Sequence, residues 1–407
     1  MQKDIKMINI LHDSEQIASF FKDGDRYAIS YESSVLVDSI ALSLPNSQKL
    51  YTWEHRFPPF LESFLPEGYL YEIFKNLLAK EYGEVNDYLI YSLLASNIEN
   101  RITFKSDTSA LEYPVLNVED ILEDDSTDTF NRLLHTFLNK NAISGVQPKT
   151  LAIVRDKESL VLKEHIVKTW GDEFPYLAEN EFFCLKALET AGIKIPKIHL
   201  SKNKHFLVVE KFIYREDHSL WGFEEVISLL DKNRDKKYSG SYEQVAKVIY
   251  SFSTNKKSSM EQFFKTIVMN FLLKNGDAHL KNFGLLFSDD FKEIRFSPAY
   301  DVVNTVVYIY KDKPALTLNG KKIWWSKKEL LKFAQTQCYI SKSQSERYYD
   351  ECYAALKKAI VNLGEYVEEN EHFKNIGTKM LDTWRLSLLE QDMKELDNDL
   401  MRSWKAY

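Results

Sequence analysis

The chain has 407 residues, which is too long for one small core and predicts two or three folded units. Hydrophobic residues make up 44% and aromatic residues 14%, so the sequence can fill sizeable cores and is that of a globular protein. The formal net charge is −7, from 53 basic and 60 acidic residues, which argues against duplex DNA binding as the main task of this chain.

Residues 1–105 are predicted to form a small unit of mixed secondary structure. Residues 27–31 alternate between apolar and polar side chains like a strand, and residues 101–104 have the composition of a second strand. Between them, residues 60–82 show the apolar spacing of a helix, interrupted at Pro66-Glu67-Gly68. We therefore expect an N-terminal α/β subdomain.

Residues 106–130 are acidic and rich in Ser and Thr, which predicts a connector with one short helix. Residues 131–213 then show the order strand, strand, helix, strand, which is the order that a nucleotide-binding small lobe needs. These four elements are expected at 150–154, 160–163, 179–191 and 206–210.

Residues 214–407 are predicted to be mainly helical and to form a catalytic large lobe. The segment 260–273 has an apolar stripe at helical spacing, and further helices are expected at 326–335, 341–363 and 378–404. A basic patch is possible at Lys321-Lys322 with Lys327-Lys328, although a solvated helix start is the interpretation we favour.

The three cysteines and the N-terminal residues indicate a cytoplasmic protein. Cys184, Cys338 and Cys352 form no CxxC pair and no metal spacing, and a sparse, odd count suits a reducing compartment. Cys184 lies in an apolar helix and is expected in the core. Residues 1–20 lack the continuous apolar stretch of a signal peptide or a spanning helix, so no membrane association is expected.

The most informative feature is the segment NGDAHLKNF at 275–283, followed by PAYD at 298–301. It places an Asp, an Asn five residues later, and a second Asp after a predicted hairpin of residues 284–287 and 294–296. Phosphotransferases of the protein-kinase type use Asp, Asn and Asp in this order to orient the attacking hydroxyl and to hold Mg²⁺. Because Asn, Gly and Asp also build ordinary turns, a plain loop remains an alternative when this segment is considered alone.

Other segments resemble one family, the HipA serine/threonine kinases, which are the toxins of bacterial toxin–antitoxin pairs. The matching segments occur in family order, from about residue 40 to about residue 305. They are LSLP at 42–45, FLPEG at 64–68, AISGVQPKT at 142–150, NEFFC at 180–184, VEKF at 209–212, the NGDAHLKN segment and YDVVNT at 300–305. The resemblance implies an α+β, protein-kinase-like two-lobed fold with an N-terminal α/β subdomain and a mainly helical C-terminal lobe.

The resemblance also implies that residues 143–147 form a phosphate loop. The backbone N–H groups of Ser144, Gly145, Val146 and Gln147 would face the phosphates of ATP. Gly145 permits a close approach because it has no Cβ. The segment holds one glycine where such loops usually hold several, so an ordinary turn before a strand is the alternative.

Three further positions would bind the nucleotide. Lys163 would direct its ammonium group at the α and β phosphates and could pair with Glu181, although on sequence alone an edge lysine is the favoured interpretation. The resemblance implies that the backbone at Glu210 and Phe212 binds adenine. Many relatives carry an Asp after the Phe, and Ile213 in this chain leaves the ribose contact in doubt.

The resemblance and the spacing together predict the roles of the 275–301 region. Asp277 is the predicted catalytic base, and Asn282 and Asp301 are predicted to complete the catalytic set as Mg²⁺ ligands. His279 and Lys281 are expected to support the loop, and Lys281 could reach the γ-phosphate. A purely structural role is the favoured interpretation for His279.

Ser144 is the predicted site of autophosphorylation. In much of the family the modified serine lies two positions earlier, where this chain has Ala142. Ala142 could be natural, with Ser144 as the regulated serine, or an engineered change that keeps the kinase active. A phosphate on Ser144 would add about two negative charges beside the triphosphate and repel it.

The resemblance implies a protein substrate that is an aminoacyl-tRNA synthetase, whose phosphorylation would arrest translation and growth. It also implies a HipB-type helix-turn-helix antitoxin as partner, so that DNA contact would be indirect. Two alternatives remain open at the level of sequence. One is a small-molecule kinase, against which the LSLP segment argues, and the other is a catalytically silent pseudokinase that serves as a binding module.

Overall fold

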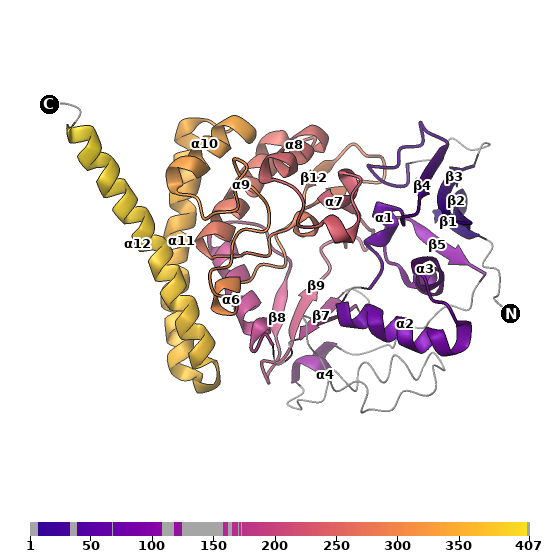
Figure 1. Cartoon of the computed structure of the whole chain (residues 1–407), viewed down its shortest axis with the longest axis horizontal. Coiled ribbons are helices and arrows are strands. Elements are labelled where there is room, and N and C mark those ends of the chain that lie inside the picture. The colour runs from indigo at the N-terminus through magenta and orange to yellow at the C-terminus, as the bar shows by residue number, and fades with distance from the viewer. Residues whose placement is uncertain are drawn as a thin grey trace. The chain divides into compact units, whose positions relative to one another are not determined.

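The computed structural model describes residues 7–32, 39–66, 68–107, 118–123, 158–161, 165–169, 171 and 173–404 (Figure 1). These residues divide into two compact units. The first holds the described residues up to Pro175 with Lys197–Lys237 and Gly284–Ile294, and the second holds Tyr176–Pro196, Tyr238–Phe283 and the described residues from Arg295 onward. The predicted domain boundaries near residues 105, 130 and 213 divide the chain into consecutive stretches, whereas each of these two units is made of several separate segments. The predicted boundaries therefore stay a prediction.

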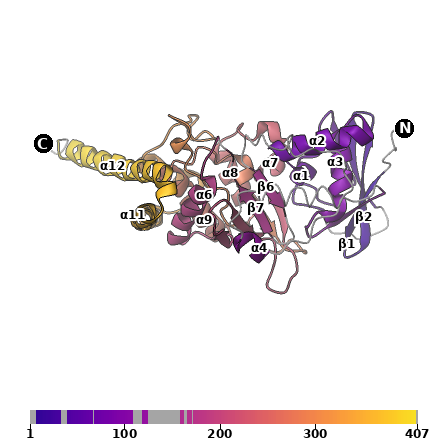
Figure 2. The ribbon, with the colours of Figure 1, turned by 90° about the horizontal axis from the view of Figure 1, so that it is seen from below.

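The N-terminal part of the first unit is an antiparallel five-stranded sheet with the order β4-β3-β2-β1-β5. The strands are β1 (Ile8–His12), β2 (Glu15–Asp23), β3 (Arg26–Tyr31), β4 (Leu50–Glu54) and β5 (Thr103–Ser106). Helices α1 (Pro59–Glu62), α2 (Gly68–Tyr82) and α3 (Asp87–Leu94) follow β4 along the chain. The rings of Tyr88 and Tyr91 on α3 meet the buried Phe20 edge-on, so α3 closes the core over one face of this sheet (Figure 2).

Two smaller sheets complete the first unit. The antiparallel sheet β6-β7-β9-β8 contains β6 (Glu158–Val161), β7 (His165–Thr169), β8 (Ile198–Leu200) and β9 (Leu207–Glu210). The sheet β10-β11-β12 contains β10 (Gly222–Glu225), β11 (Gly284–Phe287) and β12 (Ile294–Phe296), of which Arg295 and Phe296 belong to the second unit. Short helices α4 (Val118–Glu123) and α7 (Val226–Leu229) accompany them.

The second unit is predominantly helical. Its helices are α6 (Leu177–Thr190), α8 (Tyr242–Phe252), α9 (Lys256–Leu272), α10 (Lys327–Gln337), α11 (Lys342–Glu369) and α12 (Lys374–Trp404). Helix α9 is central, because Phe263, Phe264 and Ile267 are all completely buried. A capping box of Ser241 and Gln244 fixes the start of α8. Helices α11 and α12 lie side by side in both ribbon views (Figures 1 and 2).

Most of the predicted elements are present. The predicted α+β class, the interruption between α1 and α2, the hairpin of β11 and β12, and the long helices from α9 onward are confirmed. The predicted strand at 150–154 and most of the acidic connector lie outside the described residues. Strands β1, β2, β4, β7, β8 and β10 and helices α3, α7 and α8 were not predicted. In the part of the chain that the structure describes, no helix is both long and apolar enough to cross a lipid bilayer.

Candidate active site

The loop that carries Asp277 is fixed to the end of helix α9. The side-chain amide of Asn275 donates to Asn270 Oδ1 at 2.9 Å, and the backbone N–H of Asn275 donates to the Asn270 carbonyl at 2.8 Å. Asn275 Oδ1 in turn accepts from the backbone N–H of Asp277 at 3.0 Å. Because Asn270 and Asn275 are both buried, these bonds hold the backbone of Asp277 in place.

The carboxylate of Asp277 is oriented but remains accessible. The hydroxyl of Tyr238 donates to Asp277 Oδ1 at 2.8 Å, and His279 Nε2 lies 4.0 Å from the same oxygen. The Asp277 side chain is 30% exposed, whereas that of His279 is 7% exposed. The Tyr238 and His279 rings meet edge-on at 5.2 Å. A carboxylate held this way can accept a proton from a hydroxyl that approaches from solvent.

Asn282 and Asp301 are brought together, as their spacing predicts. Asn282 Nδ2 donates to Asp301 Oδ2 at 2.9 Å and lies 3.3 Å from the Asp301 carbonyl oxygen. The hydroxyl of Tyr300 donates to the carbonyl of Lys281 at 2.6 Å, which ties the same two segments a second time. Asn282 therefore faces Asp301 although the two are 19 residues apart.

Asp301 has a left-handed backbone, with φ of 59°. Among residues with a side chain, Asn and Asp tolerate this region best, and such strain is often found at functional sites. The conformation is held by the bonds that Asn282 makes to the side chain and the carbonyl of Asp301. The strain therefore coincides with a predicted metal ligand.

The residues present fit a bound Mg²⁺. Asn282 Oδ1 is buried and accepts no hydrogen bond from the described residues, and the Asp301 carboxylate lies beside the same side chain. Both supply the oxygen atoms that Mg²⁺ prefers. No group of three or more His, Cys, Asp or Glu residues gathers as a metal site in the described ranges.

Gly276 is required by a close contact inside the loop. A Cβ at this position would lie 2.0 Å from Asp312 Oδ2 and 2.7 Å from Thr305 Oγ1. The Gly276 N–H donates to Thr305 Oγ1 at 2.8 Å, and that hydroxyl donates to Asp312. The chain after Asp301 is therefore packed directly against the loop that carries Asp277.

A second set of bonds clamps the segment after Asp301 to two helices. Asn180 on α6 donates to the Asn304 carbonyl at 3.0 Å and accepts from the Asn304 N–H at 2.8 Å. The Asn304 side chain donates to Thr383 Oγ1 on α12 at 2.6 Å. Asn180 and Asn304 are completely buried, so the clamp is shielded from water.

Glu210 and Phe212 belong to the first unit. The Glu210 carboxylate lies 3.1 Å from Lys197 Nζ and 3.6 Å from His199 Nε2, so its side chain serves ion pairs on the sheet. The Phe212 ring meets Phe223 edge-on at 5.2 Å. These contacts leave the predicted adenine contact to the backbone, and that contact stays a prediction.

The remaining predicted residues lie outside the described part of the chain. They are Ser144, Gly145, Val146 and Gln147 of the predicted phosphate loop, with Ala142 before it, and Lys163. Glu181 is buried on α6. Because Lys163 lies outside the described residues, the predicted pairing of the two side chains is untested. Tyr238 and Asp312 were not predicted as site residues, since nothing in the sequence near either position marks it as a partner of the loop.

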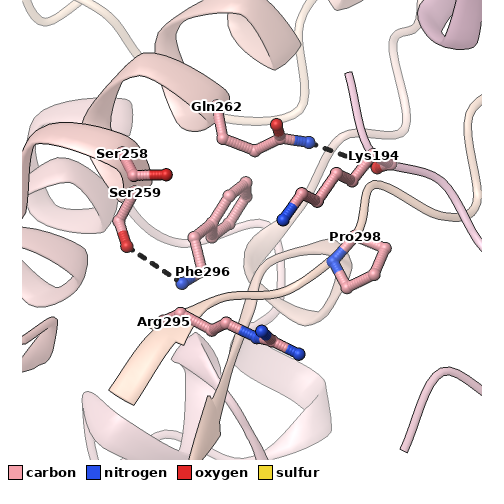
Figure 3. A pocket seen from close by; sticks show the side chains of 7 residues that line it. All are labelled: Lys194, Ser258, Ser259, Gln262, Arg295, Phe296 and Pro298. Carbon is pink, nitrogen blue, oxygen red and sulfur yellow. Dashed lines mark hydrogen bonds between the residues drawn. The ribbon is translucent and has the colours of Figure 1, made fainter. Parts of the chain in front are cut away.

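A small pocket at the start of α9 is separate from the predicted site residues (Figure 3). It is lined by Lys194, Ser258, Ser259, Gln262, Arg295, Phe296 and Pro298. Gln262 Nε2 donates to the Lys194 carbonyl at 3.2 Å, and Ser259 Oγ accepts from the Phe296 N–H at 3.2 Å. Its side-chain hydrogen bonds thus join α9 to β12 and to the segment after α6, which favours a structural role.

Two protein-family models match this chain. Residues 8–98 match the HipA N-terminal domain and residues 141–360 match the HipA-like C-terminal domain. A Haemophilus influenzae protein named "Putative kinase" is 28% identical over 184 residues, or 41% of this chain and 53% of that protein. Sinorhizobium fredii "Putative kinase Y4dM" is 24% identical over 291 residues, or 65% of this chain and 66% of that protein. The chain thus spans about half to two thirds of the length of these relatives.

One solved structure matches nearly the whole chain. It is a chain of the Shewanella oneidensis MR-1 toxin–antitoxin system HipA, HipB and operator DNA complex. The TM-score is 0.69 at 14% identity, with 94% of this chain and 97% of that chain covered. The predicted kinase-like α+β fold of the HipA type is therefore confirmed.

Proposed function

This chain belongs to the HipA family, and from that premise we propose that it is an ATP- and Mg²⁺-dependent serine/threonine protein kinase that acts as a toxin. The observation that carries the proposal is the loop from Asn275 to Asn282. It presents an oriented, accessible carboxylate at Asp277 and, five residues later, an amide bonded to Asp301. Phosphoryl transfer asks a protein mainly for such positioning and for charge neutralisation.

Each residue has a definite task in the proposed reaction. Asp277 accepts the proton of the attacking hydroxyl, and the Tyr238 hydroxyl and the Asn275 amide keep it oriented. Asn282 and Asp301 would hold Mg²⁺ through their side-chain oxygens. Bound Mg²⁺ supplies neutralisation of the charge on the triphosphate. Lys281 lies on the same short turn and is proposed to reach the transferred phosphoryl group.

The nucleotide-facing residues and the regulation are proposed on the resemblance. The loop with Ser144, Gly145, Val146 and Gln147, together with Lys163, would hold the phosphates. The backbone at Glu210 and Phe212 would hold adenine. Phosphorylation of Ser144 would place negative charge beside the triphosphate and switch the kinase off. Mass mapping after incubation with Mg·ATP tests this, and an unmodified peptide covering Ser144 would refute it.

The proposed substrate is an aminoacyl-tRNA synthetase, and the proposed partner is a HipB-type antitoxin. The solved complex that matches this chain contains HipA, HipB and operator DNA, which supports the proposed partner. The net charge of −7 also suits a chain that reaches DNA only through a partner. We propose that the protein works in the cytoplasm, which its sparse, odd number of cysteines suits.

The test is phosphate transfer from labelled ATP with Mg²⁺ to a panel of purified aminoacyl-tRNA synthetases, with Asp277→Ala as control. Label on a synthetase with the native protein and none with the variant supports the proposal and names the target. Label on the chain alone supports a kinase with another substrate. A different outcome is that no protein and no sugar or aminoglycoside acceptor is labelled. If the starting protein then also carries no phosphate on Ser144, the pseudokinase alternative is correct.

A further inference from the structure

The segment from Ile309 to Lys328 is a basic stretch of the second unit. It holds six lysines and one aspartate, in a chain whose net charge is −7. The aspartate, Asp312, accepts from Thr305 and from the Lys313 N–H, so its charge is engaged locally. Lys313 and Lys321 are exposed and form no ion pair with any carboxylate in the described ranges. Lys327 pairs with Asp350 at 3.0 Å, so the positive charge directed to solvent includes that of Lys313 and Lys321.

Large apolar side chains are exposed within the same segment. Tyr310 is 84% exposed, Ile309 is 47% exposed and Ile323 is 43% exposed. The Lys311 ammonium lies 5.0 Å above the Tyr310 ring. Single exposed apolar residues are ordinary, but three beside a row of lysines form the kind of mixed surface that proteins use for recognition.

The segment is tied to the predicted catalytic carboxylate. Lys322 Nζ donates to the Tyr238 carbonyl at 3.2 Å, and the Tyr238 hydroxyl donates to Asp277 Oδ1 at 2.8 Å. Trp324 Nε1 donates to the Asp312 carbonyl at 3.0 Å, which joins the two ends of the segment. The segment is therefore joined, through Lys322 and Tyr238, to the carboxylate that an acceptor hydroxyl must approach.

We propose that Tyr238, with the part of this segment from Ile309 to Ile323, is the docking surface for an acidic stretch of the protein substrate, next to the phosphorylated residue. The inference rests on the proposed kinase function and adds the chemistry of its substrate. Opposite charge would guide the acidic stretch to the site, and Tyr310, Ile309 and Ile323 would pack against its apolar side chains. A protein occupant is favoured over nucleic acid because the acceptor hydroxyl belongs to a protein and the chain as a whole is acidic.

The test has a binding arm and a transfer arm, both with the full chain. Binding is measured by fluorescence anisotropy with a labelled peptide that has a central alanine between runs of aspartate. Transfer compares serine peptides with aspartate, neutral or lysine flanks. The test variant is the double charge reversal Lys313→Glu, Lys321→Glu, which spares Lys322 and its bond to Tyr238. The matched control is Lys357→Glu, Lys358→Glu on α11, where both lysines are also exposed. Thermal unfolding confirms that each variant is folded.

The native protein is expected to phosphorylate the acidic peptide with a higher kcat/KM than the neutral peptide. The test variant should lower the ratio of these two kcat/KM values about tenfold, since two opposed charges are introduced. The control variant should keep the ratio, and added salt should shrink it.

Peptide binding that is lost only in the test variant supports the surface even if transfer fails, and that failure would count against the proposed function instead. Equal transfer to acidic and neutral peptides, or an RNA oligonucleotide that displaces the labelled peptide at lower concentration, overturns the inference.

Discussion

Among the described residues, the hydroxyl of Tyr238 and the amide oxygen of Asn275 both restrain Asp277 by hydrogen bonds. Asn275 restrains the backbone N–H, whereas Tyr238 acts on the carboxylate itself. A catalytic base must keep one oxygen in a fixed direction while its charge remains available to the substrate. At the scale of single residues, Tyr238 is therefore a positioning residue for Asp277.

Tyr238→Phe removes this hydrogen bond and keeps the ring that meets His279. Because the tyrosine is half exposed, water can replace part of the lost interaction, so kcat should fall by about two- to tenfold with KM for ATP unchanged. The matched control is Tyr339→Phe, an exposed tyrosine whose ring lies 4.4 Å from that of Tyr250. Steady-state transfer assays give both constants. Equal kcat in the two variants would mean that the Tyr238 hydroxyl does not orient the base.

At the scale of elements, the loop after α9 packs without spare room. Gly276 lies against Thr305 and Asp312, and these residues follow Asp301 along the chain. The sequence shows Asn-Gly-Asp, which predicts a turn, but it does not show that the glycine is needed for packing. The close approach explains why the two predicted catalytic segments can share one site.

Gly276→Ala should destabilise the second unit by about 1–3 kcal/mol and abolish transfer, because its Cβ would lie 2.0 Å from Asp312 Oδ2. Gly364→Ala is the control, since a Cβ there meets nothing within 4 Å and lies on helix α11. That change should be neutral or stabilise by about 0.5–1 kcal/mol. Urea unfolding and the transfer assay measure both effects. A fully active Gly276→Ala variant would show that the loop can relax.

In the first unit, a buried carboxylate joins the LSLP segment to the sheet β10-β11-β12. Glu224 on β10 accepts from the Ser43 N–H at 3.0 Å, from the Ser43 hydroxyl, and from Ser228 Oγ at 2.6 Å. Burial raises the pKa of Glu224, and these hydrogen bonds oppose the rise. The contact gives the N-terminal motif a physical role, which is to satisfy a carboxylate inside the core.

The raised pKa of Glu224 makes the free energy of unfolding depend on pH. The folded state binds the proton of Glu224 more tightly than the unfolded state. The stabilisation that this proton gives is therefore present below the ordinary pKa of 4.5 and is lost as the pH rises through the pKa of the folded state. Glu224→Gln cannot ionise, so the native protein should lose stability relative to this variant as the pH rises above about 4.5. Urea unfolding from pH 4.5 to 8 measures the difference, with the exposed Glu365→Gln as control. A difference that does not change with pH would contradict the prediction.

Within the whole molecule, the sequence predicts those parts of the site whose residues lie close together along the chain. Asn282 lies five residues after Asp277 on one loop, and the predicted hairpin of β11 and β12 leads from Asn282 to Asp301, so the approach of Asn282 to Asp301 could be expected from spacing alone. The helices from α9 onward were predictable for the same reason, because apolar periodicity is a local property.

The partners of the site could not be predicted, because they are distant in sequence. Tyr238 is 39 residues from Asp277, Thr383 is 79 residues from Asn304, and Glu224 is 181 residues from Ser43. Local patterns predict which element a residue joins, but only the fold decides which elements meet. The C-terminal region illustrates this, since it resembles the family only as helices and yet α12 contacts the segment after Asp301.

Helix α12 should therefore influence metal binding through Thr383. Thr383→Val keeps the shape of the side chain but removes the acceptor for the Asn304 amide, which is completely buried. The loss should cost about 1–3 kcal/mol of stability and raise the Mg²⁺ concentration needed for half-maximal transfer, because Asn304 is only three residues from Asp301. The control is Thr336→Val on α10, where an exposed hydroxyl donates to the Lys332 carbonyl at 2.9 Å and the change should be close to neutral. Lower stability with an unchanged Mg²⁺ dependence would limit α12 to a packing role. A shift in both would show that the C-terminal helix helps to hold the predicted metal ligand in its strained backbone conformation.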